Sequence, residues 1–231
     1  AQHRDDAERF IALGIDDRKV DVTGSIKFDI SVPEQSLTQG NTLKVLWGNS
    51  RPVLVLASSH EGEDDLILES YQQLLSDFPD LLLTIVPRHP ERFDEVAALI
   101  LDRGLHLGRR SESFEKGNVQ PSEMTQVYLA DTMGEMLLLL ASADIAIIGG
   151  SFIEHGGHNP LEACALSKAV VMGPSDYNFA AISQQLISEG AMQQASSEQL
   201  TICLRQLLER PELRADMGAS GQRVVADNQG A

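Results

Sequence analysis

The segment that begins at Gly156 has the residue types and spacing needed to hold a phosphorylated ligand. Gly156 and Gly157 permit a backbone with positive φ, which can approach a ligand closely. Pro160 suits the first position of a helix with Asn159 as its N-cap, and the free N–H groups at such a helix start bind a phosphate. Glu162 falls in the same turn, where its carboxylate can accept hydrogen bonds from a ribose. A plain glycine turn capped by asparagine fits these residues equally well, so both interpretations stay open.

A small basic group, formed by Arg88, His89 and Arg92, follows an apolar run in an otherwise acidic chain. Arginine can hold a phosphate or a carboxylate through two parallel hydrogen bonds. A surface loop whose charged residues begin a helix would have the same sequence. Because Arg88 lies directly at the carboxyl end of a predicted strand, we favour Arg88 over Arg92 as a ligand-binding residue.

Histidine and carboxylate side chains raise the question of a metal site. His155, His158 and Glu162 lack the spacing of four residues along one helix that zinc proteases use, and a flexible loop separates the two histidines. The acidic residues within 61–65 lie in the first turn of a predicted helix, where the helix dipole stabilises them without any cation. We therefore predict no metal site.

The sequence argues against covalent and hydride-transfer chemistry. Ser151 follows an apolar run but lacks the Gly-x-Ser-x-Gly pattern of a nucleophile elbow, and the Gly-x-Gly-x-x-Gly fingerprint of a dinucleotide site is absent. Cys164 and Cys203 are not paired in a Cys-x-x-Cys motif, which is typical of reduced thiols in a cytoplasmic compartment. Acyl transfer and hydride transfer are therefore disfavoured.

The chain of 231 residues has globular proportions, with 42% hydrophobic and 23% charged residues, and is long enough for one large α/β unit. Its 18 Lys and Arg against 34 Asp and Glu give a net charge of −16, which opposes non-specific binding to nucleic acid or to an anionic membrane surface. We therefore expect no nucleic-acid partner, and an anionic ligand needs a local group of donors. The longest apolar stretch, residues 136–148, is too short to span a membrane.

The elements that must position these residues alternate along the chain. Continuous apolar runs predict parallel strands covered on both faces, with helical patterns between them. We therefore predict an α/β fold with a doubly wound parallel sheet. In such a sheet ligands bind beyond the carboxyl ends of the strands, where the polar segments lie. The predicted strands cover 52–58, 81–87, 127–130, 144–150 and 169–173, and the predicted helices 64–78, 91–103, 134–141, 160–167, 178–189, 197–209 and 211–227.

The amino-terminal part follows a different pattern. Residues 5–13 have apolar side chains at helical spacing before Gly14, and residues 20–23 have the pattern of a short strand with no sheet of its own. Residues 31–41 are polar and show no period, so we predict a linker there. The chain opens as though a helix were already under way, and we expect it to be part of a longer protein.

Several motifs together resemble the 3-deoxy-D-manno-octulosonic acid (Kdo) transferases of Gram-negative lipopolysaccharide synthesis. The resemblance extends over nearly the whole chain, and its motifs are long enough to be specific. It implies a Rossmann-like domain that forms one half of a GT-B glycosyltransferase, in which two such domains face each other across a cleft. The motifs are SSHEGED (58–64), DLLLTIVPRHPERF (80–93), DTMGEM (131–136) and GGSFIEHGGHNPLEA (149–163), preceded by AERFIALGI (7–15) and VTGSIKFD (22–29).

The resemblance divides the chain into the tail end of an acceptor domain (1–30), the linker (31–41) and a sugar-nucleotide, or donor, domain (42–231). It implies that the intact enzyme moves Kdo from CMP-Kdo to a lipid A precursor with inversion, without a cofactor or a required metal. That enzyme would work at the cytoplasmic face of the bacterial inner membrane. Its catalytic base would lie in the other half, so we expect this chain to be soluble and inactive alone, with residues 1–30 as the place where self-association would occur.

Two other functions stay open. A sugar-nucleotide epimerase of the same architecture would bind a UDP-sugar in place of a CMP-sugar, and a nucleotide-binding module would catalyse no reaction. Nucleotide preference distinguishes the first of these from a Kdo transferase, and turnover by the full-length protein distinguishes the second.

The resemblance also assigns roles to individual residues. It places Gly156, Gly157, His158 and Asn159 at the donor phosphate, and Glu162 at the ribose. It places Arg88 at the phosphate or the Kdo carboxylate, and Ser58, Ser59, His60 and Glu61 on the sugar side. Further donor-binding residues are His89, Gly134, Glu135, Gly150 and Ser151, and Lys27 matches a family position near the hinge.

Overall fold

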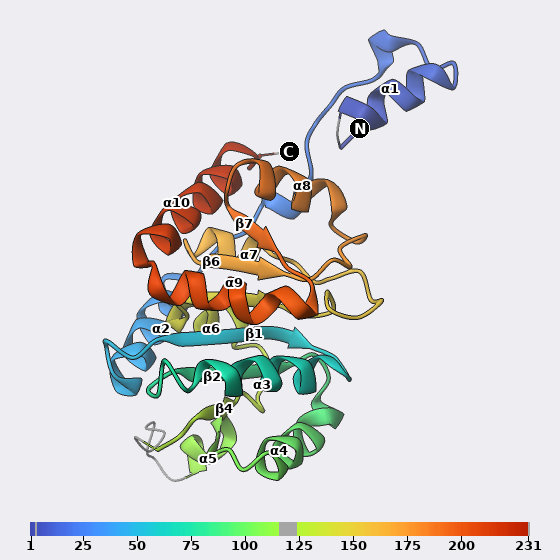
Figure 1. The fold of residues 1–231 in the computed structure, drawn as a ribbon. Coiled ribbons are helices and arrows are strands. Elements are labelled where there is room, and N and C mark those ends of the chain that lie inside the picture. Colours follow the sequence, from blue (N-terminus) through green and yellow to red (C-terminus); the bar gives the residue numbers. More distant parts are fainter. Residues whose placement is uncertain (3, 116–123, 231) are drawn as a thin grey trace.

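The computed structural model describes residues 1–2, 4–115 and 124–230, and within them the strands form one parallel sheet (Figure 1). The strand order is β3-β4-β2-β1-β5-β6-β7. All neighbouring strands run parallel. The strands are β1 (Val53–Ser59), β2 (Leu82–Pro87), β3 (Leu107–Arg109), β4 (Val127–Leu129), β5 (Ile145–Ile148), β6 (Ala169–Met172) and β7 (Met192–Gln194).

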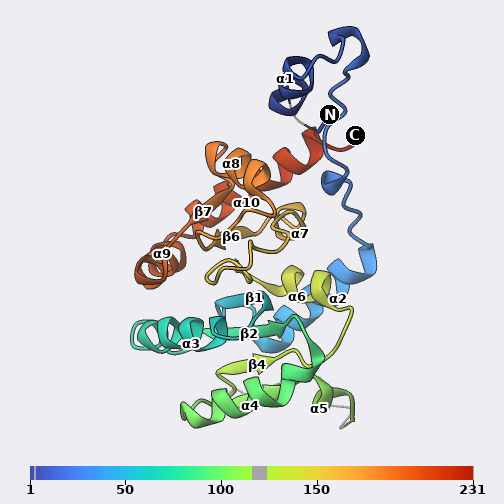
Figure 2. The same cartoon turned by 90° about the vertical axis from the view of Figure 1, so that its right-hand side faces the viewer.

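Helices cover both faces of this sheet, as Figure 2 shows from the side. Val53 and Val55 of β1 point into a core shared with α2, α6, α7, α8 and α10. Leu54 and Leu56 point into the opposite core, against α3, α4 and α9. The helices are α1 (Arg4–Ala12), α2 (Glu34–Trp47), α3 (Glu63–Leu74), α4 (Phe93–Asp102), α5 (Arg110–Glu115), α6 (Met136–Ser142), α7 (Leu161–Ala165), α8 (Ala180–Ser188), α9 (Ser197–Glu209) and α10 (Pro211–Asp227), with 3₁₀ turns at Asp17–Lys19, Ile26–Phe28 and Pro90–Arg92.

The strand order creates a switch point between β1 and β5. From β1 the chain builds β2, the edge strand β3 and then β4 between them on one side, and it returns to build β5, β6 and β7 on the other. The connections that leave β1 and β5 therefore diverge, which opens a crevice beyond their carboxyl ends. The predicted doubly wound sheet is confirmed. The short strands β3 and β7 were missed, because each contains polar residues and is only partly buried, whereas the equally short β4 is apolar and fully buried.

The segment predicted as a linker, 31–41, is helical from Glu34 onward, so the expected absence of regular structure there is wrong. Gly40, Leu43 and Trp47 form the buried stripe of α2, at the i, i+3, i+7 spacing of one helix face. A Cβ at Gly40 would lie 2.4 Å from the Cβ of Ala141, because α2 packs closely on α6. The helix is thus stabilised by packing partners outside the segment. The domain division itself stays a prediction.

The first residues of the chain stand away from the sheet in both views (Figures 1 and 2). The predicted helix is present as α1, but the predicted strand at 20–23 is wrong. A strand needs a neighbour for its backbone hydrogen bonds, and none of the described strands lies beside this segment. Phe10, Ile11 and Val22 are exposed, and self-association through this part stays a prediction. No helix within the described residues has the length and apolar character that crossing a bilayer requires.

Candidate functional site

A cavity of about 310 Å³ lies at the switch point, beyond the carboxyl ends of β1, β2 and β5. Of the predicted donor-binding residues, those in its lining are Ser58, Arg88, Gly134, Glu135, His158, Asn159 and Glu162. The lining residues that were not predicted are Thr132 and Met133, from the loop before α6, and an apolar group of Ala57, Val86, Pro87, Met136, Leu139, Leu140 and Ile148. Thr132 and Met133 could have been predicted from their position shortly after the strand β4, rather than from their residue types.

The end of β1 has an unusual backbone. Ser58 adopts φ +60, in the left-handed region, and the pairing with β2 shifts register at this position. A Cβ at Gly149 would lie only 2.4 Å from the Ser58 carbonyl oxygen. The ends of β1 and β5 therefore approach so closely that only glycine fits at position 149, and this approach forms one wall of the cavity.

The buried carboxylate of Glu63 joins the two loops at the switch point. It accepts hydrogen bonds from the backbone N–H groups of His60 (3.1 Å), Gly150 (2.6 Å), Ser151 (3.0 Å) and Phe152 (2.9 Å). Interpreting Glu63 from sequence as an acid in a first helical turn missed this role, because three of its four partners are almost ninety residues away. The carboxylate fixes the loop after β1 against the loop after β5.

The other predicted donor-binding residues do not line the cavity: Ser59, His60, Glu61, His89, Gly150, Ser151, Gly156 and Gly157. Ser59 and Ser151 are fully buried, and the Ser151 hydroxyl donates to the Ile148 carbonyl and accepts from the Gly173 N–H. Glu61 is exposed. Ser151 therefore connects the end of β5 to the segment after β6.

Gly156 and Gly157 have the expected positive φ, +86° and +73°, but protein atoms rather than open space surround them. A Cβ at Gly156 would lie 2.4 Å from the Tyr177 ring, and a Cβ at Gly157 would lie 2.0 Å from the Met172 methyl group. The glycines therefore allow the loop to pack against the segment after β6. Whether they also contact a ligand stays a prediction.

The backbone donors of this loop are engaged within the protein. The N–H groups of Gly156, Gly157 and His158 donate to the Ser175 hydroxyl (3.0 Å), the Gly150 carbonyl (2.7 Å) and the Gly149 carbonyl (3.1 Å), in that order. The free N–H groups that we predicted belong to the helix start, which follows these three residues. Within the part of the turn that the structure describes, the N–H groups of Asn159 and Glu162 have no protein acceptor.

The start of α7 agrees in part with the capping prediction, because the helix begins at Leu161 with Pro160 in the N-cap position, one residue later than predicted. Asn159 Oδ1 accepts a hydrogen bond from the Leu161 N–H at 3.1 Å, and Pro160 has helical dihedral angles, φ −80° and ψ −18°. Glu162 lies half-buried in the cavity wall, and burial raises the pKa of its carboxyl group. Among the described residues this carboxylate has no hydrogen-bond or ion-pair partner, so it is available to a ligand.

The two arginines of the basic group have different environments. Arg92 is largely buried and forms ion pairs with Asp64 (2.7 Å) and Glu95 (3.0 Å). Arg88 is exposed, lines the cavity, and makes no side-chain hydrogen bond or ion pair with any described residue. The preference for Arg88 as a ligand-binding residue therefore agrees with the geometry, whereas Arg92 is bound within the protein.

Glu135 enters the cavity wall from the loop before α6. The Arg110 guanidinium donates to both of its carboxylate oxygens, at 2.7 and 3.1 Å, and the Thr132 hydroxyl donates to one of them. Burial acts to raise the pKa of Glu135, but the hydrogen bonds from Arg110 and Thr132 outweigh burial, and the net shift is downward. The side chain is therefore ionised and held in place.

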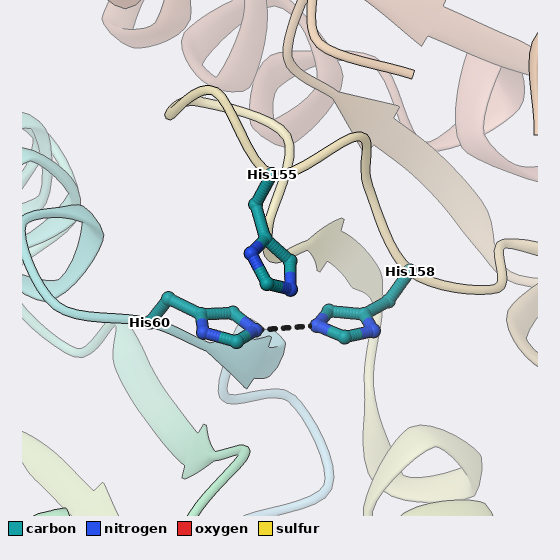
Figure 3. Close-up of side chains that lie close together, drawn as sticks. All are labelled: His60, His155 and His158. Carbon is teal, nitrogen blue, oxygen red and sulfur yellow. Dashed lines mark hydrogen bonds between the residues drawn. The ribbon is translucent and has the colours of Figure 1, made fainter. Parts of the chain in front are cut away.

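Histidines gather where the loops after β1 and β5 meet (Figure 3). The Nε2 atoms of His60 and His158 lie 2.7 Å apart, so one ring donates a hydrogen bond to the other. The ring centroid of His155 is 4.0 Å from that of His60. Burial, then the neighbouring His155, lowers the pKa of both His60 and His158 to about 4. Both rings are therefore neutral at pH 7.

Lys27 connects the amino-terminal segment to this region. Its Nζ donates to the Asn178 carbonyl at 3.0 Å and lies 4.1 Å above the centre of the Phe179 ring. Asn178 in turn donates from its side chain to the His155 carbonyl (2.9 Å) and from its backbone to the Gly156 carbonyl (3.1 Å). The assignment of Lys27 to a hinge stays a prediction. A single residue, Asn178, links Lys27 to the loop that contains Gly156 and Gly157, the glycine loop.

Comparison with known proteins gives consistent results. The family described as glycosyl transferases group 1 matches residues 57–224. The 3-deoxy-D-manno-octulosonic acid transferases of Haemophilus influenzae and Bordetella pertussis are 39% and 38% identical over all of this chain, which spans 53% of each. A crystal structure of the C-terminal CMP-Kdo binding domain of WaaA from Acinetobacter baumannii is 35% identical, with a TM-score of 0.77, and the match covers 84% of this chain and 99% of that one. The chain thus spans about half the length of these curated relatives.

Proposed function

The chain belongs to the group 1 glycosyltransferases and, within them, to the Kdo transferases, so we propose that its cavity binds the CMP part of CMP-Kdo. The observation that carries this proposal is the site at the switch point of a donor-binding half, lined by Arg88, Asn159 and Glu162. A domain 35% identical to this chain is described as CMP-Kdo binding. The same elements would hold the same class of ligand here.

The charges of the lining residues fit a CMP-sugar. Such a donor has one phosphate and one sugar carboxylate, and it enters a protein with a net charge of −16. Arg88 supplies a cation with no protein partner among the described residues, and the N–H groups of Asn159 and Glu162 supply two further donors. We place the phosphate near these donors. Arginine is well suited to this role because its guanidinium forms paired hydrogen bonds with oxyanions.

The ribose and the sugar take opposite sides of this phosphate in our proposal. Glu162 has an unpartnered carboxylate in the cavity wall, and a carboxylate accepts hydrogen bonds from ribose hydroxyls. Ser58 and His158 line the part of the cavity formed by β1 and the glycine loop, and we assign them to the sugar side. Glu135 is occupied by Arg110 and Thr132, so its role is to shape the wall rather than to bind through a free carboxylate.

For the complete enzyme we propose transfer of Kdo from CMP-Kdo to a lipid A precursor, with inversion, at the cytoplasmic face of the inner membrane. A glycosyl transfer needs a base near the acceptor hydroxyl as well as a stabilised leaving phosphate. The chain supplies donors for the phosphate, and we assign the base to the half of the enzyme that faces it. Residues 1–30 and 31–41 would then connect that half to the donor domain.

Calorimetric titration of the chain with CMP and with UMP tests this proposal. We expect CMP to bind more tightly than UMP, with a dissociation constant weaker than about 10 μM because half of the cleft is absent. Glu162→Ala tests the placement of the ligand and should weaken CMP binding. Preference for UMP would instead support the UDP-sugar enzyme, and binding of neither nucleotide would contradict the donor assignment.

A further inference from the structure

We propose that His60, His155 and His158 form a binding site for a divalent transition-metal ion such as Zn²⁺, at the border of the nucleotide cavity. One ring nitrogen of each residue lies within 4.8 Å of those of the other two. Figure 3 shows the three rings facing one another, although they come from two loops nearly one hundred residues apart in the sequence. The site departs from our sequence-based prediction of no metal, which considered His155 and His158 with Glu162 rather than with His60. It goes beyond nucleotide binding, although it shares His158 with the cavity wall.

The distances are close to those of a metal centre. Tetrahedral zinc with Zn–N bonds of about 2.05 Å places its nitrogen ligands roughly 3.3 Å apart. The Nε2 atoms of His60 and His158 are 2.7 Å apart, so this pair has to separate by about 0.6 Å. From the 4.8 Å limit, His155 has to move inward by at most about 1.5 Å. Rotation about side-chain bonds supplies shifts of this size without moving the backbone.

The backbone holds the three residues in register. Glu63 accepts hydrogen bonds from the N–H groups of both His60 and Gly150, which fixes one loop against the other. A Cβ at Gly150 would lie 3.0 Å from Cδ2 of His158 and 3.3 Å from Cδ2 of His155. The absence of a side chain at this position therefore gives both rings the room to meet. Ligands held on a fixed backbone lose little freedom when a metal binds.

The chemistry of the ligands selects the class of ion. Imidazole nitrogen suits Zn²⁺ and its transition-metal neighbours, whereas Mg²⁺ and Ca²⁺ prefer oxygen. His60 is buried, His158 is half-buried and His155 is exposed, so the ion has a route from solvent to the two inner ligands. The net charge of −16 attracts cations to the molecule as a whole, although Arg88 and Arg92 lie near these rings. Three histidines leave one coordination position for water.

The test is a calorimetric titration of the chain, free of any polyhistidine tag, with ZnCl₂. We expect one saturating site per chain. His60→Ala and His155→Ala should each weaken zinc binding by at least ~10-fold, since loss of even a second-shell partner costs 10- to 100-fold. His89→Ala is the matched control, because His89 is exposed with its ring centroid 5.5 Å from that of His60, yet lies outside the ligand set. Its affinity for zinc should equal that of the unsubstituted chain.

Co²⁺ in place of Zn²⁺ provides a second readout, because a low-coordinate nitrogen site gives cobalt a visible absorption band that His155→Ala should abolish. His155 is exposed, so this variant tests the site without disturbing a buried position. The proposal is overturned if zinc binds His155→Ala and His60→Ala as tightly as the unsubstituted chain, if His89→Ala loses as much affinity as they do, or if no site saturates. CMP titrations of the metal-free chain report on the nucleotide site separately.

Discussion

Glu162 is subject to opposite demands from folding and from ligand binding. Its carboxyl group is half-buried without a protein partner, and burial raises its pKa. A group whose pKa is raised on folding contributes stability at low pH, and that contribution is lost as the pH rises through the folded-state pKa. At pH 7 the ionised side chain therefore destabilises the fold, while in our proposal it supplies the hydrogen-bond acceptor for a ribose.

We expect Glu162→Gln to raise the melting temperature at pH 7 and to leave it nearly unchanged below the usual glutamate pKa of about 4.3. The same change should weaken CMP binding by roughly 1.5 to 3 kcal/mol, the range for a hydrogen bond to a charged group. Thermal denaturation at the two pH values and calorimetry measure these effects. A variant that melts lower at pH 7 and binds CMP normally would assign Glu162 a structural role.

Arg88 and Arg92 form a natural comparison, because they lie four residues apart and, among the described residues, only the Arg92 side chain has ion-pair partners. Arg88→Ala should weaken binding of CMP or CMP-Kdo by roughly 1.5 to 3 kcal/mol and leave the melting temperature unchanged. Arg92→Ala should instead destabilise the fold by about 3 to 5 kcal/mol, since it leaves the buried Asp64 without its cation. Calorimetry and urea unfolding measure the two effects, and a reversed pattern would contradict our assignment.

At the residue scale, the sequence identified the residues that line the cavity better than it identified which residues contact one another. Arg88, Asn159 and Glu162 were chosen for their types and their positions after strands or at a helix start, and all three line the cavity. Gly156 and Gly157 were chosen for their freedom of φ, which they use to pack against Tyr177 and Met172. Those partners could not be predicted, because the pairing of two loops depends on the order of strands in the sheet.

Among the structural elements, Glu63 shows how one carboxylate can fix two loops. It accepts four backbone hydrogen bonds and is fully buried. In Glu63→Gln an amide N–H₂ would replace one oxygen and face N–H donors, so at least one of these donors loses its acceptor. We expect a loss of stability of ~3 kcal/mol or more, measured by urea unfolding. The exposed neighbour provides the control, because Glu61→Gln should unfold at the urea concentration of the unsubstituted chain.

The elements themselves followed from apolar runs and helical periods. The buried strands β1 and β2 have continuous apolar sequences, and α9 and α10 have the predicted bounds. The helix α2 was not predicted, because residues 31–41 are polar and its buried stripe begins at Gly40, a residue that disfavours helix. Only the close packing on α6 explains a glycine there, and that contact is not local in sequence.

For the whole molecule, we expect that the chain alone does not transfer Kdo. General-base assistance is worth ~10² to 10⁴ in rate, and correct placement of donor and acceptor contributes on the order of 7 to 11 kcal/mol in favourable cases. Our proposal assigns both to the facing half. Purified chain incubated with CMP-Kdo and a lipid A precursor should release no CMP in response to the acceptor, as followed by mass spectrometry. Acceptor-dependent turnover near that of the full-length enzyme would place the base within these 231 residues.

The contact of Lys27 with Asn178 gives the segment before the sheet a thermodynamic connection to the glycine loop. Coupling between two binding events is reciprocal: whatever one contributes to the other is returned in equal amount. If a bound ligand stabilises the glycine loop, it therefore also stabilises the hydrogen bond between Lys27 and Asn178. The free energy of this stabilisation equals the free energy that the hydrogen bond adds to ligand binding. The contact of Lys27 with Asn178 and a ligand in the cavity would therefore shift the same conformational equilibrium.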